Sequence, residues 1–477
     1  MTLKLTKIVV TLGPSLDDEI VLRKVILAGA TVFRANFSHG TADDHARRIQ
    51  SVRKVAADLQ TEVAILADLQ GPKIRVARFR EKKVLLRDGQ SFVLDANLPS
   101  DLGDETQVGI DYKELPHDVS AGDTLLLDDG KIILSVTQVD GSRIICTVLD
   151  GGELSNNKGI NRQGGGLSAP ALTDKDAEDL KTALKLGADY IAVSFPRSAA
   201  DIVEARILVK AARGSAKIIA KIERAEAVHV IDDIINASDG VMVARGDLAV
   251  EIGDAEVPAV QKRIIMRSRA LNKPVITATQ MLESMITCPV PTRAEVSDVA
   301  NAVLDATDAV MLSAETATGK YPDKAVEAMT RIAVTVEENP DMDSMIRWHD
   351  EDNAVEQVDE AIARATMYTA NHLNITAIIA MTESGSTPLW MSRVRAHIPI
   401  YALSRHITTQ RIVSLYRGVF PINFDATTIE HGDINTAAIM TLRELGVLKK
   451  GDRVILTHGD RAGIHGKTNT MKIMEVG

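Results

Sequence analysis

The stretch KIIAKIERAEAVHVIDDIINASDGVMVARGDL, residues Lys217 to Leu248, decides the fold. Its two apolar runs, Ile218–Ile222 and Gly240–Ala244, are too short for helices and predict two strands. Apolar residues recur between these runs with helical spacing, at Val230, Ile231, Ile234 and Ile235. The stretch therefore predicts a strand–helix–strand unit.

Both predicted strands end in charged residues. Lys221 and Glu223 close the first strand, and Arg245 and Asp247 close the second. Because residues two apart in a strand share a face, Lys221 and Glu223 are expected to point the same way. Glu223 and Asp247 suit a hard divalent cation, and Lys221 is expected to remain free to face an anion. An ion-pair belt at a sheet edge is the alternative.

The composition is typical of a globular chain with a large core. Of 477 residues, 45% are hydrophobic and 25% charged, and the length predicts roughly three domains. The 3% aromatic content and the net charge of −10 disfavour nucleic acid and anionic membranes as partners. Two cysteines, with no signal-peptide or membrane-spanning pattern, lead us to expect a cytosolic protein.

A strand–helix rhythm repeats along the chain and is interrupted once. Three strands are expected before the interruption, at Lys7–Gly13, Thr31–Ser38 and Val63–Gln70. Five are expected after it, at Tyr190–Phe195, Lys217–Glu223, Gly240–Leu248, Pro274–Gln280 and Asp308–Glu315. Eight apolar strands, each followed by a helical segment, predict an α/β fold of the (β/α)8 TIM-barrel type.

The interruption, residues 71–168, has an all-β pattern with recurrent turn signals. Asp140-Gly141 separates two apolar segments, which is a strong hairpin signal. We expect an inserted β domain that acts as a lid over the barrel mouth, although an inert insertion would give the same pattern. The barrel would then comprise residues 1–70 and 169–340.

After a polar linker (341–353), residues 354–477 predict a separate C-terminal α/β domain. Its strands are expected at Ala377–Thr382, Pro399–Ser404, Val419–Phe424, Arg453–Thr457 and Thr470–Val476. A hydroxyl-rich turn joins the first strand to a helix and resembles an anion site; it comprises Thr382, Glu383, Ser384, Gly385, Ser386 and Thr387. Arg461 and Lys467 are expected to complete a phosphate pocket, although hydroxyls at a helix start are usually just caps.

Polar residues end most of the barrel strands, and the carboxyl ends of barrel strands converge on one mouth. They are Arg34, Asn36, Ser38, Asp68, Lys221, Glu223, Asp247, Thr279, Ser313 and Glu315. Carboxylates, cations and hydroxyls together suit a metal-held polyanion, with phosphoryl transfer as the natural candidate.

Six motifs in these strand ends closely resemble those of the pyruvate kinase family, in the family's order along the whole chain. They are Arg34…Asn36-Phe37-Ser38-His39-Gly40, Asp68…Gly71-Pro72-Lys73-Ile74-Arg75, Ala220-Lys221-Ile222-Glu223, Ala244-Arg245-Gly246-Asp247-Leu248, Ala278-Thr279-Gln280-Met281-Leu282-Glu283-Ser284-Met285 and Met311-Leu312-Ser313…Glu315-Thr316. The resemblance implies phosphoryl transfer from phosphoenolpyruvate to ADP, giving pyruvate and ATP, in a cytosolic, glycolytic homotetramer.

The resemblance also implies roles for the residues at the mouth. Glu223 and Asp247 match the ligands of Mg²⁺ or Mn²⁺, and the amides of Gly246 and Asp247 match a site for the substrate carboxylate. Lys221 and Arg34 match the cations that stabilise the phosphoryl group. The remaining matches are Thr279 beside the enol carbon, Ser313 and Glu315 in a proposed proton relay, and Asn36, His39 and Arg75 on the nucleotide side.

One departure concerns a monovalent cation. Most of the family uses K⁺, whose ligands match Asn36, Ser38, Asp68 and the backbone of Leu69. The K⁺-requiring members carry a glutamate where this chain has Lys73. An ammonium group has the charge of K⁺, so we expect no K⁺ requirement; a solvent-facing Lys73, or one paired with a lid carboxylate, is the alternative.

The turn at 382–387 resembles the family's effector loop, so we expect a phosphorylated allosteric effector to bind there. Its hydroxyls, with few cations nearby, favour a sugar monophosphate or AMP. Two other functions remain open from the sequence: a Mg²⁺-dependent lyase acting on the enolate of pyruvate, and a catalytically inactive barrel that senses metabolites.

Overall fold

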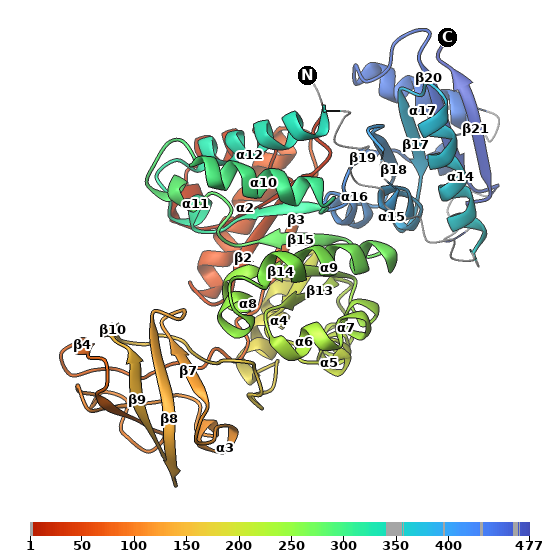
Figure 1. Ribbon diagram of the computed structural model, residues 1–477. Helices are drawn as coiled ribbons and strands as arrows, with labels where there is room; N and C mark the ends of the chain where they lie inside the picture. Colours follow the sequence, from red (N-terminus) through yellow and green to blue (C-terminus); the bar gives the residue numbers. More distant parts are fainter. Residues whose placement is uncertain are drawn as a thin grey trace.

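The computed structural model describes residues 3–339, 355, 357–394, 396–429, 433–460, 466 and 468–477. The linker expected at 341–353 lies outside these residues, as do Arg461 and Lys467. Three structural units are visible: a central barrel, a β insertion and a C-terminal α/β domain (Figure 1).

Eight parallel strands close into a barrel in the order β1-β16-β15-β14-β13-β12-β3-β2, which confirms the predicted fold class. Their bounds are β1 (Lys7–Thr11), β2 (Val32–Asn36), β3 (Ala64–Asp68), β12 (Tyr190–Val193), β13 (Lys217–Ile222), β14 (Gly240–Ala244), β15 (Val275–Ala278) and β16 (Ala309–Leu312). Every residue of six of these strands is buried, because helices cover the outside and side chains fill the inside.

Helices surround the barrel. They are α1 (Glu19–Leu27), α2 (Ala42–Asp58), α4 (Asp174–Lys185), α5 (Ala199–Ala211), α6 (Ala225–His229), α7 (Ile231–Ala237), α8 (Arg245–Ile252), α9 (Val257–Ala270), α10 (Arg293–Leu304), α11 (Ala314–Ala317) and α12 (Pro322–Glu337), with 3₁₀ turns η1 (Pro14–Leu16) and η2 (Glu283–Ile286). Four of them begin with a capping box, in which a hydroxyl and an acidic residue three positions later satisfy exposed amides. These pairs are Thr41–Asp44, Thr173–Asp176, Ser198–Asp201 and Thr292–Glu295.

The helix expected between β13 and β14 differs from the prediction, because it is broken into α6 and α7. Val230 lies at the break with φ −112° and ψ 30°, outside helical geometry, and its side chain is 38% exposed. Ile231, Ile234 and Ile235 are buried as expected. The apolar spacing therefore identified the buried face but not the break, which moves Val230 off that face.

The insertion is an all-β unit with one short helix, α3 (Leu115–Asp118). Its two sheets have the strand orders β10-β4 and β11-β7-β8-β9-β5-β6. The strands are β4 (Lys83–Leu86), β5 (Ser91–Asp95), β6 (Gln107–Gly109), β7 (Thr124–Leu127), β8 (Ile132–Asp140), β9 (Arg143–Asp150), β10 (Gly152–Ser155) and β11 (Ile160–Arg162). Gly141 turns the predicted hairpin between β8 and β9, with φ 57°.

The C-terminal domain is a five-stranded sheet in the order β19-β18-β17-β20-β21, with only β21 antiparallel to its neighbour. Its strands are β17 (Ala377–Met381), β18 (Ile400–Ser404), β19 (Val419–Asn423), β20 (Arg453–His458) and β21 (Thr470–Glu475). Its described helices are α14 (Val358–His372), α15 (Ser386–Arg393), α16 (Ile407–Val413) and α17 (Ile434–Glu444), with the 3₁₀ turn η3 (Ala426–Thr428). Within the described part of the chain, no helix has the length and apolarity needed to cross a membrane.

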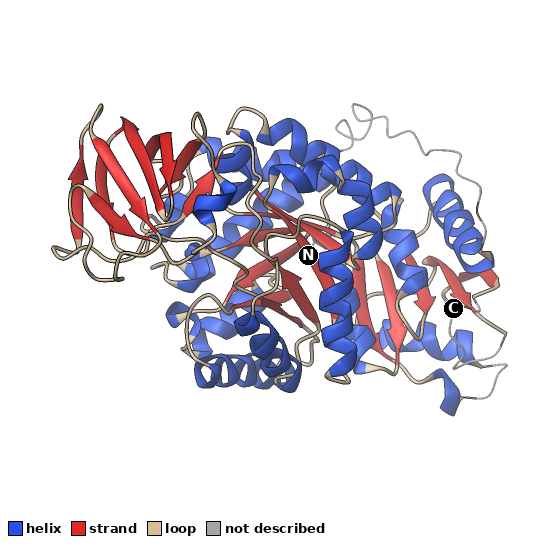
Figure 2. Cartoon of the chain, turned by 90° about the horizontal axis from the view of Figure 1, so that it is seen from below, coloured by secondary structure: helices blue, strands red, loops and turns tan. Residues whose placement is uncertain are grey.

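The C-terminal domain packs against the amino ends of the barrel strands. Arg393, which ends α15, pairs with the fully buried Asp308, which directly precedes β16. Lys7, the first residue of β1, donates to the carbonyl of Val419 at 2.5 Å. The lid and the C-terminal domain lie at opposite ends of the molecule (Figure 2), so the carboxyl ends of the strands face the lid.

Candidate active site

Lys221 lies at the centre of the polar residues at the barrel mouth. Its Nζ lies 2.8 Å from Glu223 Oε1 and 3.2 Å from Asp68 Oδ1, and it donates to Ser194 Oγ at 2.7 Å. Lys221 and Glu223 therefore point the same way, as their spacing predicts. The two carboxylates compensate the charge of this buried ammonium group, so Lys221 would face an anion from within an ion-paired cluster.

Opposing electrostatic effects act on this cluster. Burial lowers the pKa of the Lys221 ammonium group, but the negative charges of Asp68 and Glu223 together have the larger effect and raise it above its ordinary value. Burial likewise disfavours the charged form of Asp68, yet Lys221 and Arg34 hold the pKa of its carboxyl below its ordinary value. Both groups are thus charged at neutral pH despite being buried.

Arg34 is the second cation of the mouth and contacts the same carboxylate. Its Nε donates to Asp68 Oδ2 at 2.6 Å, and its Nη1 donates to Thr11 Oγ1 at 3.1 Å. These residues come from the neighbouring strands β1, β2 and β3. Lys221 also pairs with Glu223, so two cations and two carboxylates balance in this part of the mouth, and both cations are fixed where an anionic substrate would meet them.

Glu223 has the features of a metal ligand. It is fully buried, and its Oε2 accepts the amide of Phe195 at 2.9 Å. Its Oε1 is buried, and its close contact is the ammonium group of Lys221 at 2.8 Å. Burial raises the pKa of Glu223, Lys221 opposes the rise, and the neighbouring Asp247 adds to it.

Asp247 lies in the first turn of α8 and lines the cleft above the mouth. The described residues contain no cluster of three or more His, Cys, Asp or Glu side chains arranged for a metal. Mg²⁺ does not need one, since it commonly binds through one or two carboxylates and completes its shell with water and substrate oxygens. Glu223 and Asp247 interact electrostatically and are the two carboxylates that fit such an ion.

Thr279 follows β15 and contacts the start of α8. Its Oγ1 accepts the amide of Gly246 at 2.9 Å and donates to the carbonyl of Ala278 at 2.6 Å. Thr279 and Gln280 both have positive φ, 68° and 56°. A β-branched residue in this conformation is a genuine outlier, and such strain clusters at functional sites.

Ser313 and Glu315 lie beyond β16 rather than within a strand, since the strand ends at Leu312 and α11 follows. Glu315 accepts the amides of Ser313 at 2.7 Å and Leu282 at 3.1 Å, so it links the loops after β16 and β15. Burial raises the pKa of its carboxyl, which brings protonation closer to neutral pH.

The residues matched to a K⁺ site lie at the ends of β2 and β3. Asn36 is paired with Asp68 across these strands, and its Oδ1 accepts the amide of Ser38 at 3.2 Å. The carbonyl of Leu69 accepts Ser194 Oγ at 2.7 Å. Four residues distributed over two strand ends therefore lie close to one another, as predicted.

His39, Lys73 and Arg75 lie near one another on the lid side of the mouth. Burial and the neighbouring charges of Arg75, Lys73 and Arg34 lower the pKa of the His39 imidazole. Lys73 also lines a cleft of about 330 Å³ between the lid and the mouth, which Asp247 lines from the barrel side. The inserted domain thus contributes directly to the wall of the site.

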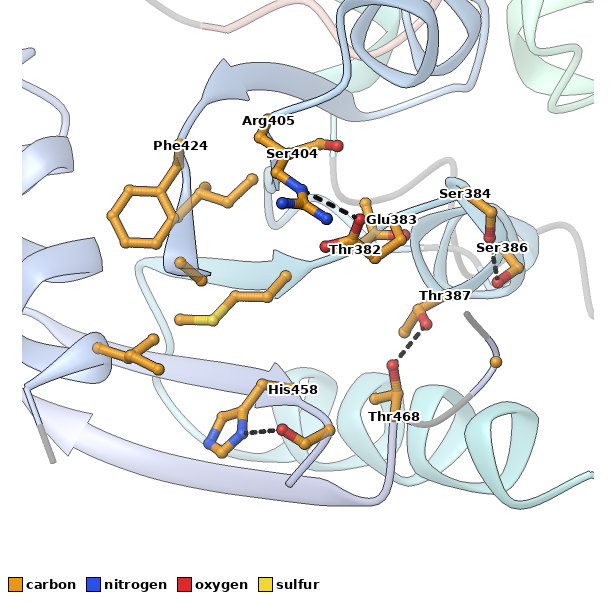
Figure 3. A pocket seen from close by; sticks show the side chains of 16 residues that line it. Thr382, Glu383, Ser384, Ser386, Thr387, Ser404, Arg405, Phe424, His458 and Thr468 are labelled. Atoms are coloured by element: carbon orange, nitrogen blue, oxygen red, sulfur yellow. Dashed lines mark hydrogen bonds and ion pairs between the residues drawn. The ribbon is translucent and has the colours of Figure 1, made fainter. Parts of the chain in front are cut away.

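The predicted effector loop lines a second, larger cavity in the C-terminal domain, of about 670 Å³ (Figure 3). Thr382 Oγ1 accepts the amide of Gly385 at 2.9 Å, and the hydroxyls of Ser384 and Ser386 lie 3.1 Å apart. Arg405 lines the cavity, but its guanidinium lies 3.5 Å from the carboxylate of Glu383.

Glu383 also pairs with His406, whose Nε2 lies 2.6 Å from its carboxylate. Thr387 contributes a hydroxyl that lies 2.9 Å from that of Thr468. The described part of the cavity is therefore rich in hydroxyls, and its cations are already paired.

Sequence reasoning missed three contributors to the mouth. Ser194 links Lys221 to the carbonyl of Leu69, and Phe195 holds Glu223 through its backbone amide with φ 55°. Arg245 binds the loop that carries Thr279. Ser194 could have been predicted, since it is a polar residue at the end of a barrel strand. Phe195 could not, because it acts through its backbone amide, which nearly every residue type has.

Comparisons with known proteins give a consistent assignment. The family profile "Pyruvate kinase, barrel domain" matches residues 3–326, and "Pyruvate kinase, alpha/beta domain" matches residues 360–474. The chain belongs to the pyruvate kinase family. This confirms the resemblance seen in the motifs, and it makes the chain a phosphotransferase.

Relatives and a solved structure agree with the pyruvate kinase assignment. The chain is 56% identical to pyruvate kinase II of Salmonella typhimurium (strain LT2), over 99% of each chain. It is 52% identical to a pyruvate kinase of Haemophilus influenzae (strain Rd), also over 99% of each chain. A crystal structure of a pyruvate kinase from Cryptosporidium parvum superimposes with a TM-score of 0.91 at 34% identity, covering 99% of this chain and 96% of that one.

Proposed function

We propose that the barrel mouth transfers the phosphoryl group of phosphoenolpyruvate to ADP, giving pyruvate and ATP in the last step of glycolysis. The observation that carries this proposal is the buried cluster of Lys221, Asp68 and Glu223, in which an ammonium group lies between two carboxylates. Such a cluster holds fixed charge where a phosphoryl group in transfer needs it, in surroundings that exclude water.

Lys221 and Arg34 are the proposed electrophilic residues. Both are held in place by Asp68, so their charges need little reorganisation when charge develops on the phosphoryl oxygens. The substrate carboxylate would bind the amides of Gly246 and Asp247 at the start of α8, where a helix N-terminus favours an anion, and the Gly246 amide would then exchange its bond to Thr279 Oγ1 for one to the substrate.

Glu223 and Asp247 would hold Mg²⁺ or Mn²⁺. When bound, such an ion supplies positive charge that neutralises the substrate oxygens. Thr279 would lie beside the enol carbon, and Ser313 with Glu315 would form the proton relay; the raised pKa of Glu315 supports its holding a proton.

On the nucleotide side we propose Asn36, His39 and Arg75. Burial is the main cause of the lowered pKa of His39, and the charges of Arg75, Lys73 and Arg34 lower it further; these neighbouring positive charges suit the phosphates of ADP and support this role.

We propose that Lys73 replaces the K⁺ ion that most of the family needs beside Asn36, Ser38, Asp68 and Leu69. Lys73 lines the active-site cleft, and none of the ion pairs formed among the described residues includes it. A K⁺ ion at ~4 Å from this ammonium group would be repelled by roughly 4 kcal/mol at an effective dielectric constant near 20. That repulsion is enough to disfavour binding of the ion.

The cavity around the 382–387 turn is the proposed allosteric site. Its hydroxyls and amides, with Arg405 and His406 already paired to Glu383, support binding of one phosphate rather than two. The effector is therefore proposed to be a sugar monophosphate or AMP.

The proposed architecture is a cytosolic homotetramer in which each chain has three domains. These are the barrel (1–70 and 169–340), the lid (71–168) and the C-terminal regulatory domain (354–477); the two family profiles support the separation of the C-terminal domain, and the separate β-sheets of the insertion support that of the lid. Val358 and Tyr368 on α14 are 66% and 67% exposed, which supports a subunit contact on this helix.

The test of the catalytic proposal is a coupled assay of pyruvate formation, with Mg²⁺ or Mn²⁺ titrated against phosphoenolpyruvate and ADP. We expect turnover that needs all three components. The comparisons do not favour the two alternatives, a pyruvate-enolate lyase and an inactive sensor. Ligand binding without ATP formation would revive the sensor, and cleavage of a carbon–carbon bond would revive the lyase.

A further inference from the structure

The backbone of Thr279 adopts a conformation that a threonine does not favour. It and Gln280 follow β15 in the left-handed region, where a β-branched side chain crowds its own backbone. Such a conformation persists only when surrounding contacts determine it. The residue that supplies most of these contacts is Arg245, to which neither the sequence motifs nor the proposed mechanism gives a role.

The guanidinium of Arg245 donates hydrogen bonds to two successive backbone carbonyls of this loop. Its Nε donates to the carbonyl of Ala278 at 3.2 Å, and its Nη2 donates to the carbonyl of Thr279 at 2.6 Å. A planar fork with several fixed donors suits two neighbouring carbonyls, whereas a lysine offers one flexible ammonium group. Arg245 therefore fixes the peptide that turns into the left-handed conformation.

The opposite side of the guanidinium is anchored to a different element. Its Nη1 donates to Asp298 Oδ1 of α10 at 2.7 Å, and the side chain is 10% exposed. Burial and this ion pair leave the guanidinium little freedom to move. The next residue, Gly246, donates its amide to Thr279 Oγ1, so the Arg245-Gly246 segment holds Thr279 at both its carbonyl and its hydroxyl.

We propose that Arg245 is a positioning residue for Thr279: it holds the strained loop so that the Thr279 hydroxyl stays beside the reacting carbon. This inference rests on the proposed role of Thr279. Arg245 acts through that residue and is not itself catalytic. A small displacement of a group at the reacting centre is enough to lower a rate by about a hundredfold.

The test is a double-mutant cycle of Arg245→Lys and Thr279→Ala, with kcat and KM measured for phosphoenolpyruvate. Arg245→Lys alone should lower kcat by ~10- to 100-fold and change KM by less than about threefold, because the loop is misplaced while the substrate carboxylate still binds. In the Thr279→Ala background, Arg245→Lys should lower kcat by less than about twofold, since the hydroxyl group that Arg245 positions is absent.

Arg206→Lys is the matched control. Arg206 also bonds a carboxylate and a backbone carbonyl, those of Asp239 and Ala237, but at the amino ends of the strands. It should lower the melting temperature without changing kcat. If Arg245→Lys does not fold, Asp298→Asn can replace it, because it weakens the ion pair that anchors the same guanidinium. Asp298→Asn should lower kcat less than Arg245→Lys does. In the Thr279→Ala background, Asp298→Asn should not lower kcat further.

Two results overturn the inference and separate it from the proposed function. If Thr279→Ala lowers kcat, and the double variant loses kcat by the product of the two single losses, Arg245 does not act through Thr279. Only the positioning role then fails. If Thr279→Ala keeps the wild-type kcat, the proposed role of Thr279 fails together with the positioning role.

Discussion

At the scale of single residues, Lys73 joins the lid to the chemistry of the mouth. It lines the cleft, and its positive charge contributes, after burial and Arg75, to the lowered pKa of His39. An ammonium group carries the same charge as a monovalent ion, which is the basis of the proposed replacement of K⁺ by Lys73.

We predict that the wild-type enzyme stays active when K⁺ is replaced by tetramethylammonium, and that Lys73→Glu creates a K⁺ requirement. The carboxylate would remove the resident charge and supply an oxygen ligand for the ion. Lys83→Glu is the control, since it makes the same charge change on β4, where Lys83 pairs with Glu153. A wild-type enzyme that is inactive until K⁺ is restored would show that Lys73 does not replace the ion.

Residue types at strand ends made most of the mouth predictable. Lys221, Glu223 and Asp68 are charges at the ends of apolar runs, and the barrel rule brings such ends together. Two kinds of feature were not predictable: hydrogen bonds donated by the backbone, such as that of the Phe195 amide, and unusual backbone conformations, such as the strained turn at Thr279. Neither depends on a residue type that a sequence pattern can identify.

At the scale of elements, the segment that returns from the β insertion to the barrel is held by the segments that follow β13 and β14. Gly164 donates its amide to the carbonyl of Glu251 at 3.0 Å, and Arg224 donates to the carbonyl of Leu167 at 2.9 Å. Glu251 also accepts the amide of Ala225 at 2.8 Å, so one carboxyl group joins α8 to α6.

Glu251 should make the stability of this junction depend on pH. Burial raises the pKa of its carboxyl from 4.5 to about 7, with Glu226 adding to the rise and Arg224 opposing it. The folded state thus favours the protonated form, so this contribution is complete below pH 4.5 and is lost as the pH rises through about 7.

We predict that Glu251→Gln removes this pH dependence, because the amide oxygen still accepts from Ala225 but cannot ionise. Between about pH 5.5 and about pH 8.5, the wild type should lose roughly 2 kcal/mol more unfolding free energy than the variant. Thermal unfolding of both proteins at the two pH values measures the difference. Equal losses would mean that the Glu251 carboxyl is already ionised in the folded state.

The elements themselves were largely predictable, because their ends carry local signals. Thr173 and Asp176 form the capping box that begins α4, and a hydroxyl followed three positions later by an acidic residue is a local signal for a helix start. The break at Val230 was not predictable, since a regular apolar period continues through it and only the backbone shows the interruption.

At the scale of the whole molecule, one helix connects the proposed effector loop to the barrel. α15 begins in the 382–387 turn and ends at Arg393, whose guanidinium pairs with Asp308 in a fully buried environment. Asp308 is followed directly by β16, and that strand leads to Ser313 at the mouth. An effector that shifts α15 would therefore act on β16 through the ion pair between Arg393 and Asp308.

We predict that a sugar monophosphate or AMP lowers KM for phosphoenolpyruvate in the wild type, and that Ser384→Glu abolishes this response. The added carboxylate would repel the phosphate, while the maximal rate should not change because the loop is remote from the mouth. Ser384→Ala, which removes only the hydroxyl, should weaken activation without eliminating it. A normal response in Ser384→Glu would place the effector site elsewhere.

The contact between the barrel and the C-terminal domain could not be predicted from the sequence. Asp308 and Arg393 are 85 positions apart, and each belongs to a segment whose local pattern is complete without the other. The two domains were recognisable separately because their strand–helix patterns are local, whereas their docking depends on side chains that meet only in the folded chain.

The most direct measurement of the central claim compares two activities of Lys221→Met: phosphoryl transfer to ADP, and proton exchange at the methyl group of pyruvate. The ammonium group is proposed to act on the phosphoryl group alone, so kcat for transfer should fall by ~10³-fold or more while exchange is far less affected. Lys217→Met, on the same strand but at its amino end, should change neither activity. An equal loss of both activities in Lys221→Met would contradict the account.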